Sequence, residues 1–447
     1  MNTCIQVGSC IMEKTQQDNK EWQVAGDYLV SLLRCALHNL NPEEKPSECT
    51  WQQVWTLAMS NSVECTACPA INKIKGEIPQ EIEKPWAELL NQNVYRLIRF
   101  QMEREQILGE MFRHGIVCLP LKGILISEYY PIYGMRWMCD NDILYGYVHK
   151  NAKGGYEPKG DSQQEQEYWK QQAQKELCAV MQSMGYAVKN LKGSHDVYQK
   201  SPFFNFEMHH KLVPEDSGLA EYYRNPWKRA ISVEEHLSGE YLVNDELTAN
   251  IPVQFRFTDE DEYLYFVAHA YKHFDNSGCG IRTLVDEYVI LQKKENLDWE
   301  YIDRELSQMK LVQFEHKLRR TALHAFGVEN QLQQEERRMI YYMLGCGTYG
   351  TSVNRVKRKL SKIDGANVSE IRRKYLKERF GLDEEKMKDF FPFFYKHKSL
   401  RILLPLYRLG KGMLVHPGRL LEEWRTVRRY TKDGSWLKIW QRSKKDL

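Results

Sequence analysis

Two aspartates separated by one residue stand inside the segment LKGILISEYYPIYGMRWMCDNDILYGYV, residues 121–148. The apolar run after them predicts a β-strand over residues 140–148, in which Asp140 and Asp142 point to one side and Asn141 to the other. Two carboxylates so placed can share a divalent cation, because Mg²⁺ prefers oxygen ligands and keeps places for water and substrate phosphates. The order therefore indicates phosphoryl transfer from a metal-bound nucleoside triphosphate, whereas the plainer interpretation of Asp-Asn-Asp is a solvated turn.

The residues that precede the aspartates carry positive charge and one glycine. Gly123 has no Cβ, so a phosphate can approach the backbone closely there, and amides at the start of the following helix favour anions. Lys122 and Arg136 can neutralise phosphate charge. Such chemistry depends mostly on positioning and electrostatics, so few residues need to react covalently.

This arrangement resembles the nucleotidyltransferase superfold of the DNA polymerase β-like group, and most closely its branch of uncharacterised nucleotidyltransferases. The resemblance spans about residues 110–290, and it departs from members with a Gly-Ser pair because Ile124 follows the glycine. The family's third carboxylate lies on a later strand, and the stretch FNFEMHHKL puts Glu207 in that place. The matching positions of the first segment are Lys122, Gly123, Tyr129, Tyr130, Arg136, Asp140 and Asp142.

The resemblance implies a role for each carboxylate. Asp140 and Asp142 are expected to hold Mg²⁺ (or Mn²⁺) on the triphosphate, and Glu207 to complete a second metal site and take the proton of an incoming hydroxyl. Strand alternation puts His209 on the side of Glu207 and His210 on the other. The expected reaction moves a nucleoside monophosphate from an NTP, with ATP the expected donor, to a hydroxyl of a small molecule, RNA or protein.

Two other function classes fit parts of the sequence. The fold can persist as a catalytically inactive nucleotide-binding or regulatory module, because fold alone does not fix function. A small-molecule kinase is suggested by the His-Phe-Asp triplet at residues 273–275, but Gly280 stands where a kinase needs asparagine. The filled carboxylate positions favour an enzyme.

The segment DEYLYFVAHAYKHF places His269 and His273 four residues apart on one helix face. The related branch has a similar helix beside its site, so the resemblance implies that these histidines and Asp286 face substrate. Zinc binding by the pair is a further interpretation, but the His-Glu-x-x-His pattern is absent. Histidines in the core or supporting the site are favoured.

Composition indicates a globular chain of 447 residues, with 42% hydrophobic and 12% aromatic residues. No run of about 18 apolar residues predicts a membrane span, and the N-terminus has no basic start typical of a signal peptide. A cytoplasmic protein with eleven reduced cysteines is expected. Zinc at Cys65 and Cys68 would need a second pair, for which Cys49 and Cys118 are poorly spaced.

Charge is unevenly distributed along the chain. From Arg355 to the end there are 26 Lys and Arg against 11 Asp and Glu, or +15, which against +3 for the whole chain leaves −12 for residues 1–354. The asymmetry allows binding of nucleic acid or another polyanion. Amphipathic helices whose Lys and Arg stems cover apolar surface explain the same pattern and are favoured.

The sequence as a whole predicts an α+β protein, with a small mixed sheet of nucleotidyltransferase type between mostly helical N- and C-terminal regions. Thr50 is expected to cap a helix, and a polar loop is expected over 150–161. Helices are predicted over 86–114, 124–130 and 163–184, and strands at 115–121, 186–191, 197–200 and 203–212. The predicted regions are a helical one (1–110), the nucleotidyltransferase core (111–215), a helical domain packing on the core (216–350) and a basic amphipathic helical region (351–447).

Overall fold

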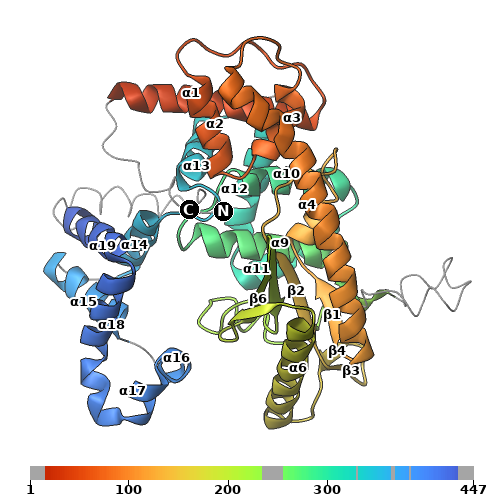
Figure 1. Cartoon of the computed structure of the whole chain (residues 1–447), viewed down its shortest axis with the longest axis vertical. Coiled ribbons are helices and arrows are strands. Elements are labelled where there is room, and N and C mark those ends of the chain that lie inside the picture. The colour runs from red at the N-terminus through yellow and green to blue at the C-terminus, as the bar shows by residue number, and fades with distance from the viewer. Residues whose placement is uncertain (1–15, 234–254, 329–330, 364–367, 382–383, 431–447) are drawn as a thin grey trace, which may run out of the picture. The chain divides into compact units, whose positions relative to one another are not determined.

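The structure is a computed structural model that describes residues 16–233, 255–328, 331–363, 368–381 and 384–430 (Figure 1). The described residues form two compact units. The sheet unit draws on Lys14–Ala268 and Leu284–Gln334, and the C-terminal unit on His269–Thr283 and Glu335–Leu447. The division into four regions stays a prediction.

A five-stranded mixed sheet lies at the centre of the sheet unit, in the order β1-β2-β7-β6-β5. Strands β2 and β7 run parallel, whereas the other neighbouring pairs are antiparallel. The α+β class with a small mixed sheet is therefore confirmed. The strands are β1 (Val117–Pro120), β2 (Asn141–Gly146), β5 (Ala187–Asn190), β6 (His195–Lys200) and β7 (Phe204–His209).

One face of this sheet is covered by two helices, α4 (Gln80–Arg113) and α6 (Gln163–Ser183), as Figure 1 shows. Phe206 and Met208 of β7 and Ile143 of β2 belong to the buried apolar cluster that includes residues of both helices. Because side chains alternate along a strand, Asp142 and Glu207 point to the opposite face. The sheet thus presents its polar positions away from α4 and α6.

Local signals explain where several helices begin. Thr50 accepts a hydrogen bond from the backbone of Gln53, whose side chain bonds back to Thr50, so the predicted cap is a capping box for α2 (Trp51–Ser60). The Ser162 side chain caps α6 in a similar way, by accepting from the backbone of Glu165. The predicted long helix that leads into β1 is confirmed as α4.

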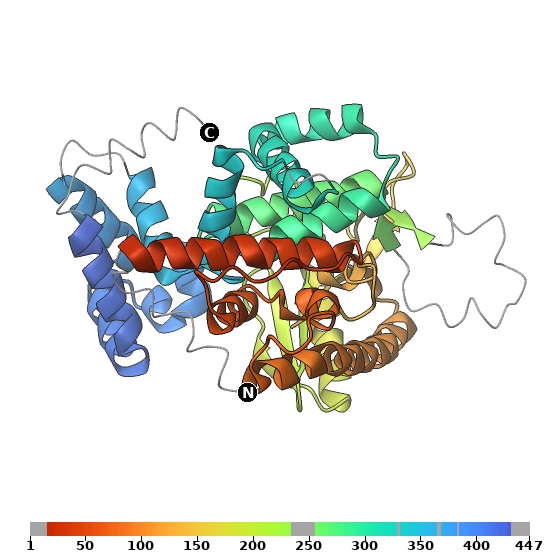
Figure 2. The same ribbon diagram turned by 90° about the horizontal axis from the view of Figure 1, so that it is seen from above.

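The N-terminal helices and those that follow the sheet complete the sheet unit. Helix α1 (Gln16–Leu37), drawn in red in Figure 2, contacts α2, α3 and α12. The remaining helices are α3 (Glu64–Ile71), α5 (Gly123–Ile126), α10 (Arg282–Lys293), α11 (Trp299–Met309) and α12 (Val312–Phe326), together with most of α9 (Asp259–Phe274).

The structure differs from the sequence prediction at α5, which ends at Ile126 where a helix to residue 130 was expected, and at five strands. Strand β2 begins one residue later than expected, so Asp140 precedes it. The loop predicted over 150–161 contains β4 (Tyr156–Pro158), which pairs with β3 (Val148–Lys150). The region 216–350, expected to be helical, contains β8 (Ala230–Ser232) paired with β9 (Phe255–Phe257). Strands of three residues are too short to show a period of two in the sequence.

The C-terminal unit is helical, as the interleaved basic and apolar residues over 351–447 predict. Its helices α14, α15 and α19 share a small core that includes Val356, Tyr375 and Val427. Several apolar side chains of α18 are exposed, among them Leu406 and Leu414, so the basic residues do not cover all of the apolar surface. Polyanion binding by this region stays a prediction. Besides the end of α9, its elements are α13 (Gln334–Cys346), α14 (Ser352–Lys362), α15 (Val368–Phe380), α16 (Glu384–Phe390), α17 (Pro392–Lys396), η2 (Lys398–Leu403), α18 (Leu404–Val415) and α19 (Pro417–Tyr430).

None of the described helices combines the length and the apolar character needed to cross a membrane. None of the nine described cysteines forms a disulfide bond.

A buried acidic cluster joins three helices of the sheet unit. The hydroxyl of Tyr263 on α9 lies 2.7 Å from Glu287 Oε1 on α10 and 2.5 Å from Glu315 Oε1 on α12. Arg319 contacts Glu315 at 2.8 Å, and both glutamates are fully buried. Burial, and to a lesser degree the nearby charge of Glu315, raises the pKa of Glu287 to about 8.

This raised pKa predicts that the protein loses stability as pH rises from about 5 to 8. In that range the unfolded chain has already lost the Glu287 proton while the folded chain still holds it, so the free energy of unfolding falls by up to about 1.4 kcal/mol per pH unit. Urea unfolding at several pH values measures this slope, and Glu287→Gln, which cannot ionise, should flatten it. An equal slope in both proteins would contradict the assignment.

Candidate active site

Asp142 and Glu207 occupy directly paired positions on the parallel strands β2 and β7. Neighbouring strands lie about 4.8 Å apart, so the two carboxylates leave the sheet side by side. Asp142 is buried and Glu207 is partly exposed. Sequence reasoning predicted both residues, but it could not show that their strands are adjacent, which the structure establishes.

The carboxylate of Asp142 is held by two side chains. Its Oδ1 atom lies 2.9 Å from Lys122 Nζ and 2.7 Å from His209 Nε2. Burial by itself would raise the pKa of Asp142, but the Lys122 cation and the hydrogen bond with His209 outweigh it and hold that pKa well below its ordinary range. Asp142 is therefore ionised at neutral pH.

Lys122 reaches Asp142 from a turn with an unusual backbone. Its φ of 46° and ψ of −113° lie in a region that residues with a side chain rarely adopt. Burial would lower the pKa of Lys122, yet the charge of Asp142 raises it above its ordinary value. A partly buried cation on a strained backbone, beside a buried carboxylate, is typical of functional sites.

Gly123 and Arg136 lie against each other beside the site, and phosphate binding by either stays a prediction. A Cβ atom on Gly123 would lie 2.9 Å from Arg136 Nη1, so the missing side chain makes room for the guanidinium. Arg136 is buried and pairs with Asp286 through Nε at 2.8 Å and Nη2 at 2.9 Å. Tyr130 donates a further bond to Asp286 at 2.7 Å. Asp286 was expected to face substrate, and the structure gives it these two protein partners.

The segment before β2, residues 134–138, is hydrogen-bonded to helix α4 through its backbone carbonyls. Asn93 on α4 is fully buried and donates to the carbonyl oxygens of Gly134 and Arg136 at 2.7 and 2.9 Å. Arg96, one turn further along α4, donates to the carbonyl of Met138 at 3.0 Å. These contacts set the position of Asp140. Sequence reasoning missed them, although polar residues recurring on the apolar face of a long helix are the signal that could have shown them.

Asp140 lies one residue ahead of β2 and is partly buried. Its negative charge helps to raise the pKa of Lys122 and of Arg136 against the lowering effect of burial, with a smaller contribution than the direct partner of each, Asp142 or Asp286. Asp140 therefore lies near both cations. A role as metal ligand stays a prediction.

Two histidines lie beside Glu207, and sequence reasoning found one of them. His195 on β6 is the register partner of His209 on β7, and its Nε2 atom lies 3.6 Å from Glu207 Oε2. The candidate ligand atoms of His195, Glu207 and His209 all lie within 4.8 Å of one another. His195 was missed because no local pattern relates it to β7. His210 follows the last residue of β7 and is partly buried, and burial lowers its pKa to about 3.

His269 and His273 lie together on α9, with their Nε2 atoms 3.1 Å apart, as their spacing predicts. Both belong to the C-terminal unit, whereas Asp142 and Glu207 belong to the sheet unit. Their role toward substrate stays a prediction. Cys65 and Cys68 are buried thiols, and among the described residues they are not part of a group of three metal-ligating side chains.

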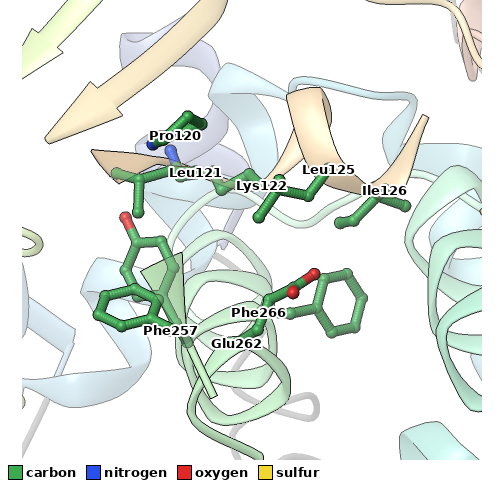
Figure 3. Close-up of a pocket in the computed structure, with 9 residues that line it drawn as sticks. Pro120, Leu121, Lys122, Leu125, Ile126, Phe257, Glu262 and Phe266 are labelled. Carbon is green, nitrogen blue, oxygen red and sulfur yellow. The ribbon is translucent and has the colours of Figure 1, made fainter. Parts of the chain in front are cut away.

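A small and mostly apolar pocket opens beside the Lys122 turn (Figure 3). In Figure 3, Leu125 and Ile126 of the turn face Phe257 and Phe266 across it. Glu262 is its acidic residue, and the Glu262 carboxylate accepts from Tyr129 at 2.8 Å and pairs with Lys294 at 3.1 Å. The pocket is lined by Pro120, Leu121, Lys122, Leu125, Ile126, Phe257, Glu262, Tyr265 and Phe266.

Comparison with known proteins identifies the family. The family described as uncharacterised nucleotidyltransferase matches residues 47–174 and 168–327, which together span more than half of the chain. The chain belongs to this family. No curated protein and no solved structure matches it. The family match covers β1, β2 and β7 and therefore includes Lys122, Asp140, Asp142 and Glu207.

The contacts of Asn93 generate a prediction about stability. Asn93→Ala leaves two backbone carbonyls buried without their donor, which should lower the free energy of unfolding by about 1–3 kcal/mol. Urea unfolding followed by circular dichroism measures the change. Gln92→Ala, at the adjacent exposed position of α4, is the matched control and should change stability little. Equal stability of the two variants would show that Asn93 does not fasten the segment.

Proposed function

We propose that this protein transfers a nucleoside monophosphate from an NTP to a hydroxyl acceptor and releases pyrophosphate. The observation that carries the proposal is the register pairing of Asp142 with Glu207 on parallel strands, in a chain that belongs to a nucleotidyltransferase family. Carboxylates side by side at the open face of a sheet can act on one phosphate group together.

The proposed reaction is an in-line displacement. The acceptor oxygen forms a bond to the α-phosphorus, while the bond from that phosphorus to the oxygen bridging to the β-phosphate breaks. The bridging oxygen leaves with the electron pair as part of pyrophosphate, and the hydroxyl proton passes to Glu207. Glu207 suits this role because its side chain is partly exposed, whereas that of Asp142 is nearly enclosed.

The carboxylates also fit the divalent cation that this reaction calls for. Asp142 is ionised beside Lys122, and Glu207 lies next to it, so two hard oxygen donors meet at one place, as Mg²⁺ or Mn²⁺ requires. Asp142, Glu207 and Asp140 would hold the ion. When bound, it would neutralise triphosphate charge and stabilise the leaving pyrophosphate.

The basic residues divide into two roles. Lys122 balances the charge of Asp142 and stands at the rim of the site, where it can also attract phosphate. Arg136 is committed to Asp286 in a buried two-point pair, so we assign it to positioning the segment before β2. Helix α5 has four residues, and we assign no phosphate binding to its start.

The finer points of the proposal come from the sequence. ATP is the expected nucleotide, and the acceptor is a small molecule, an RNA or a protein. The basic residues 351–447 support RNA as an acceptor or partner. A location in the cytoplasm stays part of the prediction.

A second candidate function is a nucleotide-binding or regulatory module without turnover. One observation favours it: Lys122 and His209 both bind the same oxygen of Asp142, which reduces the charge that the carboxylate offers to a metal. Binding of an NTP without transfer to any acceptor in a cell extract would support this candidate.

The proposal predicts different effects of the two carboxylates. Glu207→Gln should leave the affinity for an unreactive NTP analogue within a few fold, but lower transfer of α-labelled NTP into extract components by ~10²–10⁴-fold, the range for loss of a general base. Asp142→Asn should weaken both. Calorimetry gives the affinity, and labelling gives the transfer.

The matched control is Glu105→Gln, the same change at an exposed position of α4, which should behave like the natural protein. Transfer by Glu207→Gln at the control's rate would exclude Glu207 from the reaction. Unfolding measurements on each variant separate a catalytic effect from a structural one.

A further inference from the structure

We infer that His195, Glu207 and His209 form a binding site for a divalent transition-metal ion, distinct in its donors from an all-oxygen Mg²⁺ site. Their candidate ligand atoms lie within 4.8 Å of one another. The inference concerns metal binding alone, so it does not depend on nucleotide transfer.

The three side chains come from two neighbouring strands whose register fixes their spacing. His195 pairs with His209 across β6 and β7, and Val197 pairs with Glu207. The two imidazole rings lie 4.9 Å apart, centre to centre, and are inclined by 35°. All three side chains therefore leave the same face of the sheet and converge above it.

The distances suit an ion with short bonds. His195 Nε2 and Glu207 Oε2 are 3.6 Å apart, near the separation of about 3.4 Å between two ligands of a tetrahedral ion with bonds of about 2.1 Å. Other pairs of candidate ligand atoms lie up to 4.8 Å apart. Small side-chain rotations can bring them closer, because the side chains of His195 and Glu207 are 32% and 27% exposed. The His209 side chain is only 5% exposed, so its ring is held in place and the other two side chains move toward it.

The donor types determine which ion is preferred. Mg²⁺ takes oxygen ligands and gives up its water reluctantly, whereas imidazole nitrogen suits later transition metals such as Co²⁺ and Zn²⁺ better. Two imidazoles and one carboxylate leave further coordination positions for water or a substrate oxygen. The site therefore favours a transition metal over Mg²⁺.

Both histidines also have the supporting contacts that orient metal ligands. The Asp142 carboxylate lies 2.7 Å from His209 Nε2 and orients that imidazole ring. His195 Nδ1 lies 3.3 Å from the Ser194 hydroxyl, and its Nε2 points toward Glu207. Histidine ligands commonly bond through the second nitrogen to a carboxylate or a similar group.

The test is a Co²⁺ titration of the full-length protein after removal of metals with a chelator, without nucleotide. Equilibrium dialysis should show one Co²⁺ per chain, bound more tightly than Mg²⁺, and pulsed electron paramagnetic resonance of the bound Co²⁺ should show coupling to ¹⁴N of imidazole. His195→Ala should raise the Co²⁺ Kd at least ~10-fold and reduce the ¹⁴N coupling. Glu207→Gln should also raise this Kd.

His114→Ala is the matched control, because His114 lies on the same unit at the exposed end of α4 and beside Glu176. It should bind Co²⁺ like the natural protein. The inference is overturned if His195→Ala, with an unchanged circular dichroism spectrum, binds Co²⁺ as tightly as this control, or if ¹⁴N coupling is absent. If the natural protein binds Co²⁺ as expected but transfers no nucleotide, the proposed function is contradicted and the metal site is not.

Discussion

The buried charge of Asp142 is the constraint on which the rest of the site depends. An uncompensated charge in a protein interior costs several kcal/mol, and here Lys122 and His209 compensate it at 2.9 and 2.7 Å. Lys122 reaches the carboxylate because its turn takes a positive φ. His209 reaches it because β7 runs parallel to β2. The buried charge of Asp142 therefore depends on both the strained turn that carries Lys122 and the strand order that places His209.

A second buried ion pair supports the first from outside the sheet. Arg136 and Asp286 bond at two points, and Gly123 gives the guanidinium the space it occupies. Together with the bonds from Asn93 to backbone carbonyls, this pair ties the segment before β2 to α4 and α10. The Lys-Gly sequence thus serves both buried pairs, since the lysine meets Asp142 and the glycine accommodates Arg136. Such fixed surroundings are what chemistry by positioning and electrostatics needs.

Glu207 connects the proposed reaction with the inferred metal site. On one side it neighbours Asp142, an oxygen donor, and on the other His195, a nitrogen donor. The identity of the bound ion decides which neighbour acts with it, because hard ions prefer oxygen and transition metals accept imidazole. This gives the site two sets of donors that share one carboxylate. Because Glu207 belongs to both donor sets, metal binding and nucleotide transfer need separate measurements.

Residue order determined the α+β class, the long helix before β1 and the Thr50 cap, and it singled out Lys122, Asp142 and Glu207, which the structure brings together. These follow from local periodicity, cap chemistry and a short motif within one segment. The three-residue strands β3, β4, β8 and β9 were not predicted, because they are too short to show the alternation of apolar and polar residues that marks a strand. Only the tertiary structure decided that β2 neighbours β7, that His195 joins Glu207 and His209, and that Arg136 binds Asp286 across 150 residues of sequence. Such contacts depend on strand order and helix packing, which no local pattern encodes.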